Sequence, residues 1–169
     1  MTKNEFLKAV SRGGDEILKT VFALLKKAKA SYCVIGGLAV NAYVEPVVSL
    51  DLDLVVVTDG MDKFIELASE KFKVERFPYS INLTARRSDL RVQVQTDPHY
   101  QAFIERSLRK KVLGEMMRVA CLEDVLQGKL WAYSDEKRRM SKRQKDLADI
   151  YRLIEAYPEL KKKLPKGKW

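Results

Sequence analysis

A pair of carboxylates inside an apolar strand pattern is the feature that most constrains this chain. Residues 34–56 read VIGGLAVNAYVEPVVSLDLDLVV, in which Asp51 and Asp53 alternate with leucines. Because residues two apart in a strand point to the same side, the aspartates share one face and the leucines share the other. Two like charges this close are costly unless a cation neutralises them. The segment predicts either a cation-binding face or a strand whose carboxylates face solvent or pair with lysines.

The glycines before this strand favour the cation-binding alternative. Gly36 and Gly37 follow one apolar run and open a short amphipathic stretch. Glycine allows a close approach of the backbone to a ligand, and the free N–H groups of a helix start bind phosphate. Mg²⁺ is usually held by one or two carboxylates plus substrate phosphates. A glycine pair alone is also typical of a tight turn, but the order strand, GG, helix and DLD strand indicates a site for a metal and nucleotide phosphates.

Hydrophobic periodicity predicts an α/β protein that leads into a helical C-terminal part. Residues 1–120 are expected to form an α/β core with an N-terminal helix capped by Asp15, and residues 121–169 a helical extension with a basic tail in the same compact unit. Strands are expected at 32–35, 50–57, 74–77, 81–85 and 90–95, a hairpin at 111–119, and helices at 38–44, 61–72, 100–108, 122–133 and 141–156.

Composition narrows the classes of function. The net charge of +9 favours polyanionic partners, and much of it lies in RSLRKK (106–111) and KKKLPKGKW (161–169), for which nucleic-acid contact and plain solvation both remain open. The chain has a single histidine, His99, which argues against a histidine-based catalytic triad or a histidine-rich metal site. Two isolated cysteines form neither a disulfide framework nor a zinc motif. No apolar run approaches the ~20 residues of a membrane helix and the N-terminus has no apolar signal core, so we expect a cytoplasmic protein without membrane contact.

Two regions carry a resemblance to a known superfamily. The glycine pair, short helix and Asp-x-Asp strand resemble the minimal nucleotidyltransferase domain related to DNA polymerase β. The form GGLAVNAY followed by SLDLD (49–53) is most similar to the AbiEii-type branch, which includes toxins of toxin–antitoxin and phage-defence systems. Residues 124–155 resemble that branch's helical motif of a lysine, a basic loop, then Lys-Asp and a further Asp. The resemblance implies a nucleotidyltransferase-like mixed sheet flanked by helices, an α/β (α+β) fold with a C-terminal helical extension.

The resemblance also implies roles for particular residues. Mg²⁺ or Mn²⁺ would be held by Asp51 and Asp53. A nucleoside triphosphate would be bound by Gly36, Gly37, Ser49, Lys129 and Asp146, with Lys129 on its phosphates and Asp146 orienting the nucleotide or the basic groups of the site. The implied partners are the triphosphate, an RNA or protein acceptor, and a cognate antitoxin.

The two helical positions can also be interpreted from spacing alone. Lys129 falls on the apolar face of its helix, where a lysine is costly unless it has a partner or its stem reaches out to solvent. It is therefore expected either to snorkel or to point into a cleft that holds anions. Asp146 and Asp149 lie four residues after Lys142 and Lys145, so surface ion pairs between these residues are the simpler alternative.

The sequence departs from the superfamily's pattern at the third carboxylate. Active members usually add an acid on a neighbouring strand, where it helps hold a metal and serves as general base. The matching strand here is LRVQVQTD (90–97), in which Gln93 or Gln95 takes that place. Glutamine is neutral and cannot accept a proton at neutral pH. Asp97 lies on the same alternation but beyond the expected strand end, so its ability to substitute is left open.

A second departure concerns positive charge. The branch often carries a basic residue between the glycines and the acids, whereas this chain has EPVVS (45–49). Arg86, Arg87 or Arg91 could supply the missing charge. Two functions therefore stay open: a Mg²⁺-dependent nucleotidyltransferase acting on an RNA or protein acceptor, and a catalytically impaired module that binds nucleotide, RNA or a protein partner.

Overall fold

The computed structural model describes residues 14–86, 88–167 and 169. The expected cap at Asp15 and the suggested charge at Arg87 concern side chains outside this described part. None of the helices within it has the length and apolar character needed to cross a lipid bilayer.

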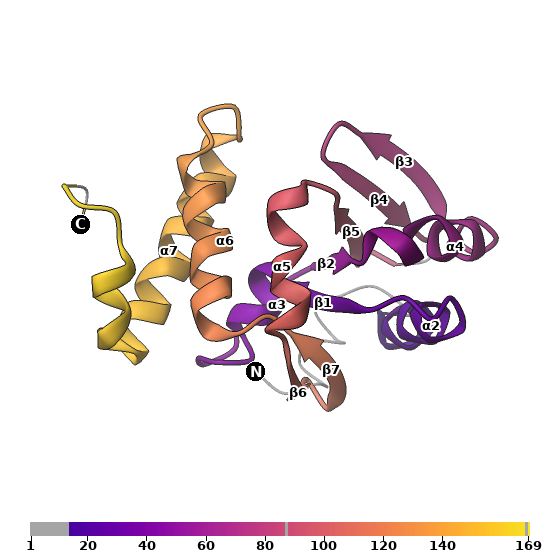
Figure 1. Cartoon of the computed structure of the whole chain (residues 1–169), viewed down its shortest axis with the longest axis horizontal. Coiled ribbons are helices and arrows are strands. Elements are labelled where there is room, and N and C mark those ends of the chain that lie inside the picture. Colours follow the sequence, from indigo (N-terminus) through magenta and orange to yellow (C-terminus); the bar gives the residue numbers. More distant parts are fainter. Residues whose placement is uncertain (1–13, 87, 168) are drawn as a thin grey trace.

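A seven-stranded mixed sheet with the order β3-β4-β5-β2-β1-β7-β6 forms the centre of the molecule (Figure 1). The strands are β1 (Tyr32–Ile35), β2 (Asp51–Val56), β3 (Lys73–Phe77), β4 (Ser80–Thr84), β5 (Arg91–Gln95), β6 (Leu108–Val112) and β7 (Glu115–Val119). β1 pairs antiparallel with β2 and parallel with β7, while β2 pairs parallel with β5. The expected mixed sheet flanked by helices is thereby confirmed.

Helices cover the sheet unevenly. They are α2 (Gly14–Lys27), α3 (Gly36–Val40), α4 (Thr58–Ala68), α5 (Ala102–Glu105), α6 (Leu122–Ser134) and α7 (Met140–Ala156), with 3₁₀ turns η1 (Pro98–Tyr100) and η2 (Pro158–Lys163). α2 and α4 lie together beside one part of the sheet, whereas α6 and α7 form a pair on the other side of the molecule (Figure 1). α3 contacts β1, β2 and both helices of that pair, so it joins the sheet to the helical extension.

Alternating burial explains why the sheet takes this orientation. Leu52 and Leu54 of β2 and Val92 and Val94 of β5 are fully or almost fully buried in the core. That core also contains the apolar residues of α2 and α4. Burying these side chains, each worth about 1.5–3 kcal/mol, holds the opposite face of β2 and β5 toward the cleft.

Two predicted helices differ from the structure. The helix expected at 38–44 ends at Val40, because the Asn41 side chain donates to the Val47 carbonyl (2.7 Å) and accepts from the Val47 amide (3.0 Å), which turns the chain back toward β2. The helix expected at 100–108 is wrong over its second half. The short helix α5 ends at Glu105, and the chain then enters β6. β6 and β7 pair antiparallel and form the first and second strands of the expected hairpin.

Candidate active site

Asp51 and Asp53 lie on the same face of β2, as the alternation predicted. Both are half-buried, whereas Leu52 and Leu54 on the other face are fully buried. In the parallel pairing with β5, Asp51 lies opposite Arg91 and Asp53 lies opposite Gln93. β5 therefore places an arginine and a glutamine directly beside the two carboxylates.

The glycine pair packs closely against the segment that carries the aspartates. Gly36 has a φ of +70°, which favours glycine, and a Cβ atom there would collide with the carboxylate of Asp53. A Cβ atom at Gly37 would lie 3.1 Å from the hydroxyl oxygen of Ser49. The two glycines thus allow the side chains of Asp53 and Ser49 to lie directly against the backbone at the floor of the cleft. Because α3 has only five residues, this close approach matters more here than a helix dipole.

The two carboxylates differ in how their charge is compensated. Asp51 accepts a hydrogen bond from Arg91 Nε at 2.9 Å, and Lys142 Nζ lies 3.6 Å from its other oxygen. Burial, and then repulsion from Asp51, raise the pKa of Asp53 to about 6, although Lys129, Arg138 and Lys142 act in the opposite direction. Asp53 therefore carries a charge that the protein's own cations leave incompletely balanced.

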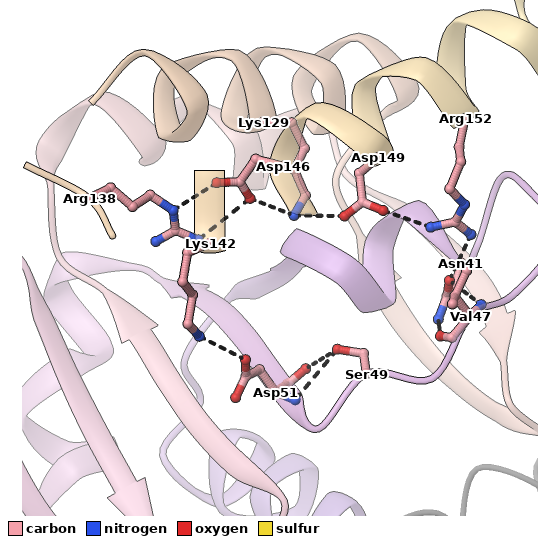
Figure 2. A network of polar contacts seen from close by, with 10 residues as sticks. All are labelled: Asn41, Val47, Ser49, Asp51, Lys129, Arg138, Lys142, Asp146, Asp149 and Arg152. Atoms are coloured by element: carbon pink, nitrogen blue, oxygen red, sulfur yellow. Dashed lines mark hydrogen bonds and ion pairs between the residues drawn. The ribbon is translucent and has the colours of Figure 1, made fainter. Parts of the chain in front are cut away.

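Lys129 lies between two carboxylates of the neighbouring helix (Figure 2). Its Nζ is 3.1 Å from Asp146 and 2.9 Å from Asp149, and its side chain is only 11% exposed. Burial lowers the pKa of Lys129, but Asp149 and Asp146 raise it by more, so the net change is upward. Lys129 accordingly stays charged inside the cleft, and the alternative in which its stem snorkels to solvent is wrong.

Asp146 is almost completely buried and binds two cations. In addition to Lys129, it accepts a hydrogen bond from Arg138 Nε at 2.7 Å (Figure 2). The alternative that paired Asp146 with Lys142 on the surface is wrong, because Lys142 reaches across the cleft to Asp51. Asp146 therefore pairs with two basic side chains that line the cleft.

Arg152 is a site residue that the sequence did not reveal. Its guanidinium donates to Asp149 Oδ1 at 2.7 Å and to Asn41 Oδ1 at 3.3 Å (Figure 2). It also donates to the backbone carbonyl of Glu45. It thereby ties α7 to the loop between α3 and β2. The three-residue spacing between Asp149 and Arg152 is evident from the sequence. The contacts of Arg152 with Asn41 and Glu45, more than 100 residues away, could not be predicted from it.

Two cavities meet at the carboxylates. The larger, of about 610 Å³, lies between β2 and α7 and is lined by Gly37, Ser49, Asp51 and Asp53 together with the cations Arg91, Arg139, Lys142, Lys145 and Arg152. The smaller, of about 100 Å³, reaches Gln93, Gln95, Tyr100 and Gly128. Both are lined by Asp53, Lys129, Arg138 and Asp146. This arrangement suits an anionic, extended ligand that passes the carboxylate pair.

The part of the chain that the structure describes contains no group of three or more His, Cys, Asp or Glu side chains placed to hold a metal. Asp97 caps η1, accepting from the His99 amide at 3.0 Å and pairing with its ring at 2.7 Å. The backbone hydrogen bond from His99 lowers the pKa of Asp97. The Asp97 carboxylate is thus bonded to His99. Gln93 is the residue that lies beside Asp53, where a third acid is expected.

The residues present nevertheless fit a divalent cation that also binds phosphate. Two carboxylates share one face, Gln93 offers an amide oxygen in the next strand, and the charge of Asp53 is incompletely balanced. Mg²⁺ needs no more than one or two carboxylates when substrate phosphates complete its coordination.

Comparison with solved structures defines the class of fold. The chain is similar to the lincosamide antibiotic adenylyltransferase LnuA (TM-score 0.56, 12% identity, covering 80% of this chain and 95% of that chain). It is also similar to ANT(2″)-Ia in complex with adenylyl-2″-tobramycin (TM-score 0.61, 13% identity, 86% and 90%) and to the nucleotidyltransferase TM1012 of Thermotoga maritima (TM-score 0.57, 18% identity, 88% and 96%). The fold is that of the nucleotidyltransferases.

The family follows from the sequence. Residues 62–166 match the model of the nucleotidyl transferase AbiEii toxin of a type IV toxin–antitoxin system. This range covers more than half of the chain, from within α4 to beyond η2, and begins after the DLD strand. The chain belongs to the AbiEii nucleotidyltransferase family, as its resemblance to that branch indicated. No protein with a curated description matches the chain at a significant level.

Proposed function

We propose that this protein is a Mg²⁺- or Mn²⁺-dependent nucleotidyltransferase that moves a nucleoside monophosphate from a triphosphate to the hydroxyl of an RNA or protein acceptor, with release of pyrophosphate. The observation that carries the proposal is the Asp51–Asp53 face, which is incompletely neutralised and opens into a cavity rich in lysine and arginine. The nucleotide would be drawn from the cytoplasmic pool.

The larger cavity supports binding of the triphosphate. Gly37 and Ser49 would lie against the phosphates, since no Cβ fills the space beside Ser49. Arg91 and Lys142 point toward the same region from opposite walls, and their positive charge replaces the basic residue that is missing between the glycines and the acids. Lys129, held by two carboxylates, would add a fixed positive charge at the centre of the cavity.

Asp51 and Asp53 would hold the divalent cation, which supplies charge neutralisation at the phosphates and orients the attacking oxygen. Asp146 would act through Arg138 and Lys129 by fixing the position of both. The protein's contribution is therefore chiefly positioning and electrostatic stabilisation, which is what phosphoryl and nucleotidyl transfer require most.

The residue beside Asp53 favours a second candidate function. Gln93 cannot take the proton of an acceptor hydroxyl, and a general base is typically worth about 10²–10⁴ in rate. If the proton has no other acceptor, the chain would bind nucleotide, RNA or a protein partner without efficient turnover. This catalytically impaired binding module is the alternative that the experiment must separate from the enzyme.

Label transfer separates the two functions. The purified protein would be incubated with each α-labelled nucleoside triphosphate, Mg²⁺ or Mn²⁺, total RNA and cell lysate, with Asp51→Asn/Asp53→Asn as the control. We expect label on RNA or on a protein with the wild type only. Nucleotide binding without label transfer would contradict the enzymatic proposal and support the binding module.

Membership in a toxin family supports a role as the toxic half of a pair with a cognate antitoxin. Expression of the wild type is expected to arrest bacterial growth, and the double asparagine variant is expected not to. Equal toxicity of both proteins would contradict a role that depends on nucleotidyl transfer.

A further inference from the structure

The carboxylate of Asp51 is shared between two cations that come from different parts of the fold. Arg91 lies opposite Asp51 in the β2–β5 pairing, and its Nε binds Oδ1 at 2.9 Å. This contact joins two neighbouring strands, so the register of the sheet maintains it. Lys142 comes from α7, and its Nζ lies 3.6 Å from Oδ2 (Figure 2). The contact of Lys142 therefore spans the larger cavity, which both residues line.

Other cations near the carboxylate pair are held more firmly than Lys142. Lys129 Nζ lies within 3.1 Å of two carboxylates and its side chain is 11% exposed, while Arg138 Nε lies 2.7 Å from the buried Asp146. The side chain of Lys142 is 35% exposed, and its distance of 3.6 Å from Asp51 exceeds the length of a charge-assisted hydrogen bond. Partly exposed ion pairs of this kind are weak because solvent screens them. Lys142 can therefore leave its partner at little cost.

The oxygen that Lys142 contacts is also one that a divalent cation would need. Arg91 binds Oδ1 of Asp51, so Oδ2 is the oxygen that remains for a metal held jointly with Asp53. An ammonium group and a metal ion repel each other and cannot both lie close to the same oxygen. Lys142 in its observed position thus opposes binding of the cation by itself.

The charge of the cavity lining adds to this opposition. The lining of the larger cavity includes seven Lys and Arg side chains and four Asp side chains, a formal excess of three positive charges. A divalent cation alone would increase this excess, whereas a nucleoside triphosphate brings several negative charges. Its phosphates would also offer the Lys142 ammonium a strongly charged new partner.

We propose that Lys142 is an exchange residue, which pairs with Asp51 until a triphosphate enters the cavity and then moves to the phosphates, so that Oδ2 becomes available to the divalent cation. The inference rests on the proposed function and deepens it by naming the residue that makes metal binding depend on the nucleotide. Because such coupling is reciprocal, the metal also strengthens the binding of the triphosphate.

Two binding measurements test the exchange without requiring turnover. Electron paramagnetic resonance would measure Mn²⁺ binding in the absence of nucleotide, and fluorescence anisotropy would measure binding of a fluorescent non-hydrolysable triphosphate in the presence of EDTA. We expect Lys142→Met to bind Mn²⁺ alone about 5- to 30-fold more tightly than the wild type, and the triphosphate alone about 3- to 10-fold more weakly. Damage to the fold would weaken both, so the opposite signs are specific to the exchange.

Three further variants serve as controls. Lys145→Met removes the same charge from α7 and from the same cavity lining, but the ion partners of Asp51 among the described residues are Arg91 and Lys142. We expect it to change Mn²⁺ affinity by less than about threefold, since solvent screens charges that are not in contact. Lys142→Arg keeps the charge and should bind both probes much as the wild type does. Lys142→Met/Asp51→Asn should lose the gain in Mn²⁺ affinity.

The results separate this inference from the proposed function. An Mn²⁺ affinity of Lys142→Met no higher than that of the wild type would overturn the exchange, and so would an equal gain in Lys145→Met or weaker binding of both probes by Lys142→Met. Label transfer with any of these results would leave the enzyme standing and refute only the exchange. Opposite shifts for Mn²⁺ and triphosphate without label transfer would support the exchange and refute only the enzymatic proposal.

Discussion

Replacement of Asp53 by asparagine is expected to stabilise the protein in the absence of ligands while it abolishes metal-dependent function. The pKa of Asp53 lies at about 6 instead of 3.8, because burial and Asp51 both disfavour its charged form. One pH unit is worth about 1.4 kcal/mol, so an ionised Asp53 costs the folded state at most about 3 kcal/mol at neutral pH. Solvent reaches part of the side chain, and we therefore expect a gain of about 1–3 kcal/mol for Asp53→Asn.

The sign of the pH dependence follows from the same pKa. The folded protein holds a proton on Asp53 more tightly than the unfolded chain does, so wild-type stability falls as pH rises from about 4 through about 6. Urea denaturation of wild type and Asp53→Asn at a series of pH values would measure the difference. It should be largest at pH 7 and small near pH 4.

Asp97 provides a control, because its substitution is expected to change stability in the opposite direction. Its pKa is lowered by the hydrogen bond from the His99 amide, so Asp97→Asn should destabilise the protein at neutral pH, by an amount that shrinks as the medium becomes acidic. A lower stability of Asp53→Asn at pH 7, or an effect of this substitution that does not change between pH 7 and pH 4, would refute a buried, charged Asp53 as the cause.

Three further substitutions test other parts of the site. Lys129→Met should cost about 3 kcal/mol or more in urea denaturation, because it removes the cation between Asp146 and Asp149 and leaves each of these buried carboxylates with a single arginine partner. Lys142→Met removes a longer and more exposed pair and should cost about 0–1 kcal/mol, and equal losses would contradict the buried network. Gly36→Ala should lower the melting temperature by several degrees, because φ is +70° and the new Cβ meets a carboxylate, while Gly128→Ala finds only ordinary contacts and should be tolerated. Gln93→Glu should raise the rate of metal-dependent label transfer at least about tenfold by supplying the missing base, and an unchanged rate with nucleotide still bound would show that this position is not the third-acid site.

Local periodicity was sufficient to predict the carboxylate face. Leu52 and Leu54 had to be buried, so Asp51 and Asp53 had to share the other side of the strand, and the structure has this arrangement. The strands and the two long C-terminal helices were also expected within a few residues of their bounds. In these segments the burial pattern and the intrinsic helix or strand preference of the residues indicate the same secondary structure.

Long-range pairing could not be predicted in this way. The partners of Lys142 and Arg152 are about 90 and more than 100 residues away, and the i,i+4 spacing on α7 favoured nearby pairs instead. The end of α3 depends on the side chain of Asn41 meeting the loop at Val47. The segment after α5 became a strand because β7 offered it a partner, which a local helical pattern does not reveal.

The Asp51–Asp53 face is expected to bind a divalent cation together with a nucleoside triphosphate. Electron paramagnetic resonance of Mn²⁺ tests it directly, by comparing free and bound Mn²⁺ for the wild type and Asp51→Asn/Asp53→Asn, with and without a non-hydrolysable triphosphate. We expect the wild type to bind Mn²⁺ much more tightly when the triphosphate is present and the variant to lose this binding. Equal binding of Mn²⁺ by both proteins in the presence of the triphosphate would contradict it.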